Sequence, residues 1–543
     1  MKTSTNKHII SFSTELEKFY YSSVLLLDDN LHNGDYLNMY LFISKDASSN
    51  NDVDIKEIDK TDLYIKNVHK NLIFMKKLIL NDINIVAERI DWKANTFYYA
   101  YSDKDNMGEK YSDGKLVRKF YVKNRFDQVF KCLWNNITSD DTVEISDITN
   151  NSYYYTVEHS GGTFEIGSYV TIQKTDPEIY NGTYVVLQSS EGVANVSYEN
   201  GEQYVFNETS DYVSGGTIKY SALTQEEPYF SVGSFDQNLG IRTSDGYKWK
   251  YLYTLDKGQK LKSFDSDWIP VPVLANRPNP TSTDEGWGCV ETINIISGGS
   301  GYENGTNTVS IIISGDGTGA SAEAFVSNNQ IQEIYMVDRG RDYLSANVSV
   351  VPSAGLSGSG AEVELSISPI GGHGFNYIKE LHCSNIIVSS IFDKSENTKL
   401  PTDFEFNQIG ILYNPYTLTD SLNHANSNYI SCFTEILVFF GENSFVAGET
   451  IYQGMSVSEA EYSATVLSFD SANNSIKVIN TSGTPKENYL IVGETSGTSR
   501  VIAGINTPIY VPNSGDIFYI ENKGVIERSP YGSEQIRILI NFS

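Results

Sequence analysis

The chain has 543 residues, of which 40% are hydrophobic, so it is long enough for about three to five folding units with buried cores. It carries 68 acidic and 40 basic residues, and its net charge of −28 argues against binding to a nucleic-acid backbone, which needs a cationic stripe. We interpret the acidity as a contribution to solubility.

Neither a targeting segment nor a membrane segment is expected. The first residues lead into no apolar stretch of the signal-peptide kind, and no apolar run approaches the roughly 18 residues that cross a bilayer. The four cysteines are far apart in the sequence, which favours free buried thiols in a reducing compartment. We therefore expect a protein that is made and assembled in a cytosol, with no membrane partner.

Residues 1–145 mix helical and strand patterns. Residues 11–22 favour a short helix, and residues 36–44 are rich enough in apolar and aromatic side chains for a buried strand. Residues 71–88 fit either one helix or two strands, and the pattern leaves both open. Residues 119–133 alternate apolar and polar side chains around a short polar turn, which predicts a β-hairpin.

Residues 146–222 differ in composition from the segment before them. Gly, Ser, Asn and Tyr dominate, and strand patterns at 169–172 and 183–187 lie between clusters of turn-forming residues. This spacing predicts a small all-β domain inserted into the chain.

Aromatic residues occupy every second position in the segment 247–253. Because successive side chains of a strand point to opposite faces, we expect Tyr247, Trp249, Tyr251 and Tyr253 to share one face. That face should pack against a core or a partner.

Residues 290–372 contain an internal repeat with an offset of 41 residues. In the first copy the recurring residues are Gly299, Tyr302, Val309, Gly317, Gly319 and Ala320, and in the second they are Gly340, Tyr343, Val350, Gly358, Gly360 and Ala361. Each copy predicts three strands joined by glycine-rich turns that use positive φ angles. We expect each tyrosine to pack back across its turn.

A looser echo occupies residues 433–506, where the triplet Gly-Glu-Thr at 448–450 recurs at 493–495. The surrounding patterns are again strands and turns, so we expect another inserted β domain. The last segment, 515–542, ends in a pattern that predicts a closing strand.

Motifs of enzyme chemistry are not found in the sequence. The P-loop, His-Glu-x-x-His and Gly-x-Ser-x-Gly patterns do not occur. A metal site formed by His373, His382 and Cys383 is conceivable, but these residues lack the spacing of structural zinc ligands, and we expect a turn histidine and an ordinary strand pair. We predict no cofactor, no metal and no enzyme activity. With 68 acidic residues, the sequence neither supports nor excludes a pair of carboxylates suited to sugar hydrolysis.

Two further segments resemble ligand sites only superficially. The glycine-rich stretch 315–319 looks like a phosphate cradle, but the repeat predicts strands after it in place of the helix that such a site needs. The acidic clusters at 28–30 and 140–141 lack the glycine and the bidentate glutamate of an EF-hand, and we expect solvated loops.

Several segments resemble one family, the homodimeric baseplate wedge subunit of T-even-like contractile-tailed phages. The most specific match is at the C-terminus, where a strand reaches Glu521 and Asn522, a short turn follows, and Glu534 and Gln535 precede the closing strand. One departure is Lys523-Gly524, where the family commonly has Arg-Pro.

The second match is the segment Asp245-Gly-Tyr-Lys-Trp-Lys-Tyr-Leu252, which is followed by Trp268-Ile-Pro-Val-Pro272. A weaker match joins Arg89-Ile-Asp-Trp92 to Phe130-Lys-Cys-Leu133. The signature residues of the resemblance are Asp245, Gly246, Tyr247, Trp249, Tyr251, Glu521, Asn522, Glu534 and Gln535.

The resemblance implies a mainly-β, multi-domain protein with a discontinuous α+β core. That core would comprise residues 1–145, 223–289, 373–432 and 507–543, with β domains inserted at 146–222, 290–372 and 433–506. It also implies a late structural protein of the virion that lies in the tail baseplate of a myovirus, is assembled in the host cytoplasm, and contacts a second copy of itself and other wedge proteins.

Two other functions are compatible with the sequence. A host-surface or glycan-binding tail protein would be favoured by exposed aromatic residues on the inserted domains. A tail-associated glycosidase would be favoured by a cleft with two close carboxylates and one raised pKa.

Overall fold

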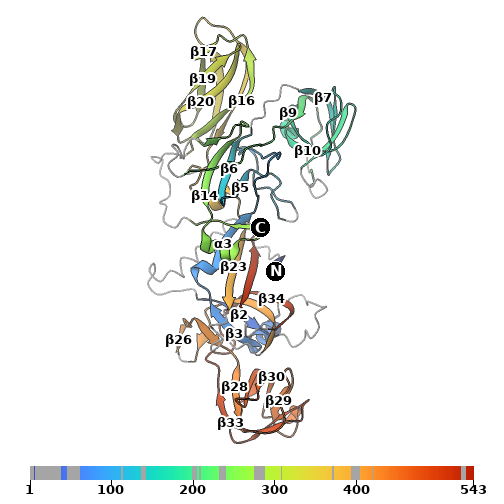
Figure 1. Ribbon diagram of the computed structural model, residues 1–543, viewed down its shortest axis with the longest axis vertical. Helices are drawn as coiled ribbons and strands as arrows, with labels where there is room; N and C mark the ends of the chain where they lie inside the picture. Colours follow the sequence, from blue (N-terminus) through green and yellow to red (C-terminus); the bar gives the residue numbers. More distant parts are fainter. Residues whose placement is uncertain are drawn as a thin grey trace. The chain divides into compact units, whose positions relative to one another are not determined.

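The structure is a computed structural model that describes residues 5–6, 38–45, 61–111, 114–135, 142–198, 205–206, 210–231, 240–273, 288–306, 308–369, 372–392, 404–418, 420–527 and 533–542. It is mainly β and multi-domain, as the sequence predicts (Figure 1). The chain divides into two compact units: a first unit of Met1–Asn84 with Ser384–Ser543, and a second unit of Ile85–Cys383. The helix predicted at 11–22 and the acidic clusters at 28–30 and 140–141 lie outside the described residues.

The first unit contains a five-stranded antiparallel sheet whose strands come from distant parts of the chain. Its order is β27 (Tyr429–Ser431), β3 (Leu72–Lys77), β2 (Met39–Ser44), β24 (Glu405–Tyr413) and β34 (Asp516–Glu527). The central strand β2 is buried along its whole length, which explains its continuous apolar and aromatic sequence.

The ambiguous segment 71–88 forms two strands, β3 and β4 (Ile83–Glu88), separated by the short 3-10 helix η1 (Leu80–Asp82). The Asp82 carboxylate accepts a hydrogen bond from the backbone N–H of Ile79 at 3.0 Å and closes the turn. The helix α2 (Asp62–Lys70) precedes β3, and its N-cap Thr61 accepts from the backbone N–H of Tyr64.

The closing strand of the chain pairs with a strand from the middle of the sequence. β35 (Glu534–Asn541) lies antiparallel to β23 (Asn385–Phe392) over all eight residues of each. β1 (Thr5–Asn6) lies parallel to β35. Separately, β25 (Tyr416–Thr417) and β26 (Asp420–His424) form a two-stranded sheet.

Residues 434–506 of the first unit form a closed six-stranded barrel, which we call the C-terminal barrel. Its strands are β28 (Thr434–Val438), β29 (Thr450–Gln453), β30 (Tyr462–Asp470), β31 (Ser475–Gly483), β32 (Leu490–Gly493) and β33 (Ser499–Asn506), with η5 (Val457–Glu459) before β30. Aliphatic side chains fill the interior, among them Ile436, Ile451, Val466, Ile476, Ile491 and Ile502. The barrel spans the segment for which an inserted β domain is expected.

The second unit contains a four-stranded sheet of order β13 (Ile241–Arg242), β14 (Lys248–Thr254), β6 (Gln128–Trp134) and β5 (Tyr121–Lys123). β5 and β6 are the hairpin predicted at 119–133. Nearby, β15 (Trp268–Pro270) pairs with β4, and the short helices are α3 (Lys257–Ser263) and α4 (Tyr377–Glu380).

A second closed barrel, the N-terminal barrel, comprises β7 (Val143–Asn150), β8 (Tyr155–His159), β9 (Tyr169–Asp176), β10 (Gly182–Ser190), β11 (Val193–Ser197) and β12 (Ser214–Tyr220), with η2 (Glu178–Tyr180). The strands expected at 169–172 and 183–187 are parts of β9 and β10. Aromatic rings contact one another inside it, including those of Tyr155, Tyr180, Tyr184 and Phe206. Many tyrosines of this segment therefore lie in the hydrophobic core of this barrel.

The repeat segment forms β16 (Val290–Ser300), β17 (Gly305–Thr306), β18 (Val309–Gly315), β19 (Thr318–Ser327), β20 (Gln330–Arg341), β21 (Ala346–Pro352) and β22 (Ser359–Ile367). The first long strand of each copy pairs with the last strand of the other copy, as β16 with β22 and β20 with β19. The middle strands β18 and β21 pair so that Ser310 faces Val351, which are equivalent positions of the two copies. The two repeats therefore form one module with internal twofold pseudosymmetry.

One strand arrangement could not be predicted from the sequence. The closing strand β35 and the Trp249 strand β14 belong to different sheets. That residues 1–145, 223–289, 373–432 and 507–543 form one core stays a prediction. A local pattern predicts that a strand exists, but it does not say which distant strand lies beside it.

Candidate functional site

The signature residue Asp245 organises the turn that leads into β14. Its carboxylate accepts hydrogen bonds from the backbone N–H groups of Gln225 at 2.6 Å and Glu226 at 3.0 Å, and from the Thr224 hydroxyl at 2.8 Å. Burial raises the pKa of Asp245, but hydrogen bonds from Thr243 and these donors outweigh it and hold the pKa below its usual value. Gly246 has a φ of +88°, which only glycine adopts without strain. The role of this turn is structural.

The aromatic strand β14 packs into the core of the second unit. The Trp249 side chain is fully buried and stacks on Tyr247 with ring centroids 5.6 Å apart, and Tyr98 meets it edge-on at 5.7 Å. Tyr251 stacks on Phe230 at 4.3 Å.

The prediction of one aromatic face holds for Trp249 and Tyr251 but is wrong for Tyr253. The β14–β6 register is irregular between Tyr251 and Tyr253, which pair with the neighbouring residues Phe130 and Val129. Neighbouring residues of a strand point to opposite faces, so this bulge turns Tyr253 to the other side.

The signature residues of β34 connect strands of the first unit through buried polar contacts. Asn522 accepts a hydrogen bond from the Gln408 amide at 2.7 Å, and Gln408 accepts one from the Ser44 hydroxyl at 2.6 Å. Glu521 accepts from the Tyr519 hydroxyl at 3.0 Å and forms an ion pair with Lys523 at 2.8 Å. These contacts fix the register of three neighbouring strands, β2, β24 and β34.

The remaining signature pair lies at the start of β35. The Gln535 amide donates to the Ser389 hydroxyl of β23 at 2.9 Å, and Glu534 lies opposite Phe392 in the same strand pair. The structure therefore places the signature residues in three separate groups, and each group serves a turn or a strand pairing.

The repeat glycines stand where two strands approach closely. A Cβ atom on Gly299 would lie 2.5 Å from the Ala361 nitrogen, and one on Gly340 would lie 2.4 Å from the Ala320 nitrogen. Gly319 and Gly360 have φ angles of +85° and +78° beside these contacts.

The repeat tyrosines reach across to the other copy. A Cβ atom on Gly358 would meet the ring of Tyr302 at 2.2 Å, and one on Gly317 would meet the ring of Tyr343 at 2.4 Å. Both tyrosines also touch their own turn glycines, Gly299 and Gly340, as the sequence predicts. The glycine pattern thus marks packing between the copies.

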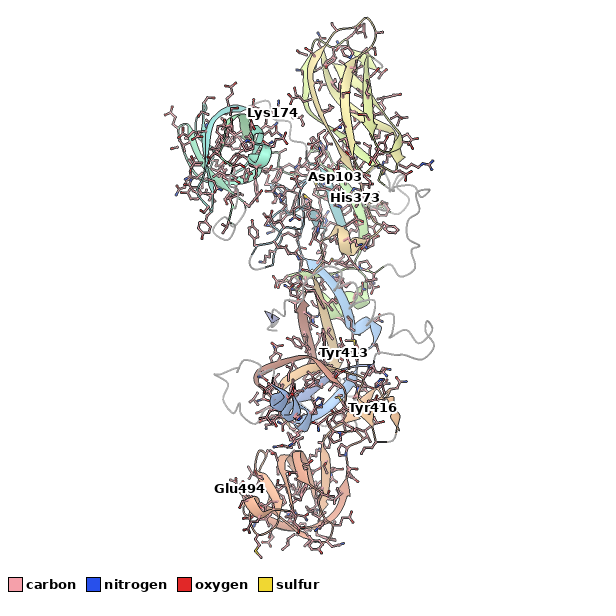
Figure 2. All side chains as sticks on the ribbon, turned by 180° about the vertical axis from the view of Figure 1, so that it is seen from behind. Asp103, Lys174, His373, Tyr413, Tyr416 and Glu494 are labelled. Atoms are coloured by element: carbon pink, nitrogen blue, oxygen red, sulfur yellow. The ribbon has the colours of Figure 1, made fainter. Side chains whose placement is uncertain are left out.

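A buried charge cluster lies on β6 and α4 and was not found from the sequence. The Lys131 ammonium lies 3.5 Å from the Glu380 carboxylate, 3.3 Å from Nδ1 of His373 and 3.8 Å from the ring centre of Tyr101. The side chains of Lys131, Glu380 and His373 are only 1–2% exposed. Figure 2 labels His373 of this cluster.

The electrostatics of this buried cluster follow from its burial. Burial lowers the pKa of Lys131, and burial together with Lys131 lowers the pKa of His373. Burial would raise the pKa of Glu380, but the nearby ammonium outweighs it and holds that pKa below its usual value. An ammonium, an imidazole and a carboxylate could exchange protons, yet side chains this inaccessible cannot meet a substrate. The cluster ties α4 to the sheet.

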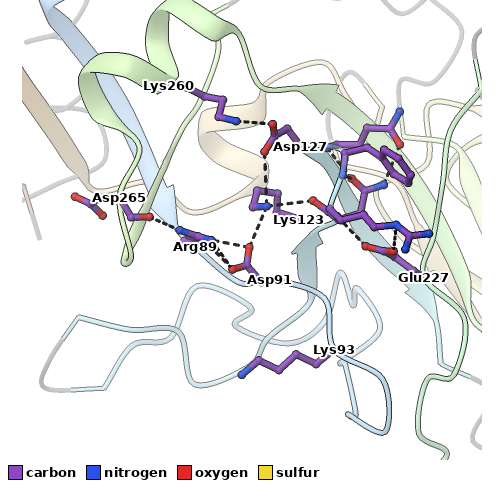
Figure 3. A network of polar contacts seen from close by, with 12 residues as sticks. Arg89, Asp91, Lys93, Lys123, Asp127, Glu227, Lys260 and Asp265 are labelled. Carbon is purple, nitrogen blue, oxygen red and sulfur yellow. Dashed lines mark hydrogen bonds and ion pairs between the residues drawn. The ribbon is translucent and has the colours of Figure 1, made fainter.

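A more exposed polar network holds the β5–β6 hairpin (Figure 3). The Lys123 ammonium lies 3.1 Å from Asp91, which also pairs with Arg89 at 2.8 Å. Lys260 of α3 pairs with Asp127 at the hairpin turn. Burial raises the pKa of Asp91, but Arg89 and Lys123 outweigh it and keep the pKa low. Each of these positive charges is paired with a carboxylate, as expected of a network that stabilises the hairpin.

The two histidines considered as metal ligands make separate contacts. His373 contacts Glu380, whereas the ring of His382 packs against Phe120, and burial lowers the pKa of His382 to about 4. Within the described parts of the chain, no group of three or more His, Cys, Asp or Glu residues is arranged to hold a metal ion. Residues 315–319 span the end of β18, the turn and the start of β19, so a strand follows the turn in place of a helix.

The buried charge cluster left only a weak, local signal in the sequence. Lys131 is a lone charge in the apolar strand sequence Val129-Phe-Lys-Cys-Leu133, which indicates a buried partner without identifying it. The exchange of strands between the repeats left no such signal, because it depends on pairing at long range.

Comparison with known proteins adds no relative to this picture. The chain matches no model of a protein family, and no curated protein sequence matches it. Among the described residues, no helix is long and apolar enough to span a membrane.

Proposed function

We propose that this chain is a structural subunit of a phage contractile-tail baseplate, a wedge protein that holds neighbouring subunits in a fixed geometry. The observation that carries the proposal is the order of the signature segments, from Asp245 to Gln535, together with their roles in turns and strand pairs. A scaffold needs such fixed registers, whereas an enzyme needs reactive groups in contact with solvent.

Several further features are consistent with a scaffold. Strands far apart in the sequence pair along their full length, as β35 does with β23, and polar side chains between strands are hydrogen-bonded. The side chains of the ion pair Lys131–Glu380 are only 1–2% exposed and are inaccessible to substrates. In this proposal the protein acts in the virion, with a second copy of itself and other wedge proteins as partners.

A second candidate function has a specific observation in its favour. Aromatic side chains on the barrels and the repeat module are solvent-exposed, including Tyr153, Tyr220, Tyr335, Phe440 and Tyr489. Exposed aromatic residues on inserted domains also suit a tail protein that binds a host surface or a glycan.

The decisive experiment is cryo-electron microscopy of purified particles, with density assigned to this chain. We expect the chain in several symmetry-related copies within the tail baseplate, in contact with other subunits. Particles with complete contractile tails that lack the chain would refute the proposal, as would a location at the outer tips alone, which would favour host-surface binding. A glycan array with the purified chain tests that second candidate directly.

A further inference from the structure

The outer face of the C-terminal barrel carries a row of apolar side chains across three neighbouring strands. The backbone N–H of Phe439, just after β28, donates to the Val501 carbonyl of β33 at 3.0 Å, and Leu490 of β32 pairs with Val501 on the other side. The next residue of β33, Ile502, is fully buried inside the barrel. Because neighbours in a strand alternate, Val501 and the residues paired with it point outward.

Four large apolar side chains of this region are more than half exposed: Phe439 at 56%, Phe440 at 83%, Tyr489 at 63% and Leu490 at 56%. Tyr489 is held beside the row, because its carbonyl accepts a hydrogen bond from the Ile502 N–H at 3.0 Å. We call these four residues the apolar face. Exposed apolar side chains gathered on neighbouring strands typically mark an interaction site.

The apolar face is held in place by a buried arginine. The Arg500 guanidinium donates to the Gly441 carbonyl at 2.8 Å and to Asn474 at 3.0 Å, and it also binds the Asn443 carbonyl. It lies 4.9 Å from the ring centre of Phe469. These contacts fix the segment that follows Phe440, so the face is formed before any partner binds, which lowers the entropic cost of association.

The charges next to the face indicate the chemistry of the partner. Glu442 and Glu487 are exposed, and each stands two residues from an aromatic member of the face. Two basic residues that lie close to the face in the sequence are engaged elsewhere, because Arg500 is buried and Lys486 is paired with Glu461. A second copy of this chain would bring carboxylates against carboxylates, which disfavours self-association here. A partner with a basic rim gains attraction instead.

We propose that Phe439, Phe440, Tyr489 and Leu490 form a docking surface for a different protein, whose contact face is apolar and rimmed by lysine or arginine. The inference rests on the proposed function in one respect, since the partner is then another subunit of the particle. A protein fits better than a glycan, because the row contains the aliphatic side chains of Leu490 and Val501, which offer a sugar neither a stacking ring nor a hydrogen bond.

The test places a photoreactive benzophenone amino acid at Phe440 in the full chain within assembled particles. We expect a crosslink to a different polypeptide, at a segment that combines apolar and basic residues. A crosslink to another copy of this chain or to a glycan would overturn the inference, as would the absence of any crosslink in particles that contain the chain. Each of these three outcomes overturns the docking surface alone and leaves the proposed function intact. Absence of the chain from the particles overturns the docking surface and the proposed function together.

A pair of double variants provides an independent measure. We expect Phe439→Ser with Leu490→Ser to reduce incorporation into particles at least tenfold, while the melting temperature stays near that of the wild type because both side chains are largely exposed. The matched control is Ile166→Ser with Val213→Ser, which removes two exposed apolar side chains from the N-terminal barrel region. Equal loss of incorporation in the two double variants would contradict a specific role of the apolar face.

Discussion

The repeat module offers a sharp test of why glycine stands at positions 299 and 340. In Gly299→Ala the new Cβ atom would lie 2.5 Å from the Ala361 nitrogen and 2.6 Å from the Ser359 oxygen, at a φ of +65°. Gly340→Ala meets equivalent atoms of the other copy at 2.4 and 2.5 Å, at a φ of +63°. The obstacles are backbone atoms of a paired strand, so they cannot move aside as a flexible side chain would.

The module also contains a matched control at Gly355. Its φ of +86° imposes the same left-handed conformation, but no atom lies within 4 Å of an added Cβ. Gly355→Ala should therefore incur only the conformational penalty of about 1–2 kcal/mol. Gly299→Ala and Gly340→Ala should cost a further amount of about 1–3 kcal/mol, as overpacking of a tight contact does.

Hydrogen exchange measured by mass spectrometry on peptides from 290–367 can separate these outcomes, because it reports the stability of the module within the full chain. The extra cost corresponds to a loss of protection of roughly 5- to 150-fold relative to Gly355→Ala. Gly299→Ala and Gly340→Ala should also agree with each other because of the pseudosymmetry. Equal protection in all three variants would show that close approach of the strands is not the reason for the glycines.

Three further predictions concern the core of the second unit. Trp249→Ala should lower the free energy of unfolding by about 3–5 kcal/mol because the side chain is fully buried, and near-wild-type melting in calorimetry would refute this. Lys131→Met should cost a similar amount, about 3–5 kcal/mol, because it leaves the buried Glu380 carboxylate without its ammonium partner, whereas Lys131→Met with Glu380→Leu should recover most of the loss in a double-mutant cycle. Since the pKa values of His373 and Glu380 are lowered in the fold, the folded state binds fewer protons than the unfolded state. Stability should therefore fall as the pH drops below about 6.5 and fall further below about 4.3, and His373→Gln should flatten the first step in urea titrations, so an unchanged pH slope would contradict that contribution.

The parts of the fold that sequence predicted correctly depend on local patterns. The buried strand β2 follows from an unbroken apolar run, and the β5–β6 hairpin follows from alternation around a polar turn. The glycine spacing of the repeat predicted its strands and turns, and the contacts at Gly299 and Gly340 explain that spacing.

Other expectations were wrong or left two alternatives open, because contacts between residues distant in the sequence determine these features. The segment 71–88 has a pattern that suits helix or strand, and its pairing with β2 makes β3 a strand. Tyr253 left the expected aromatic face because of a bulge in the pairing with β6. The sequence does not predict how the signature residues are grouped, since their positions along the chain do not show which strands adjoin.

By itself, the sequence determined the mainly-β class, the positions of many strands and the turns that require glycine, because alternation and backbone freedom are properties of neighbouring residues. Only the tertiary structure decided that the two repeats exchange strands, that Lys131 meets Glu380 and that an apolar face remains open on the C-terminal barrel. These features depend on contacts between residues that are distant in the chain, and the physical reason is that burial and pairing are settled by the whole fold and not by any one segment.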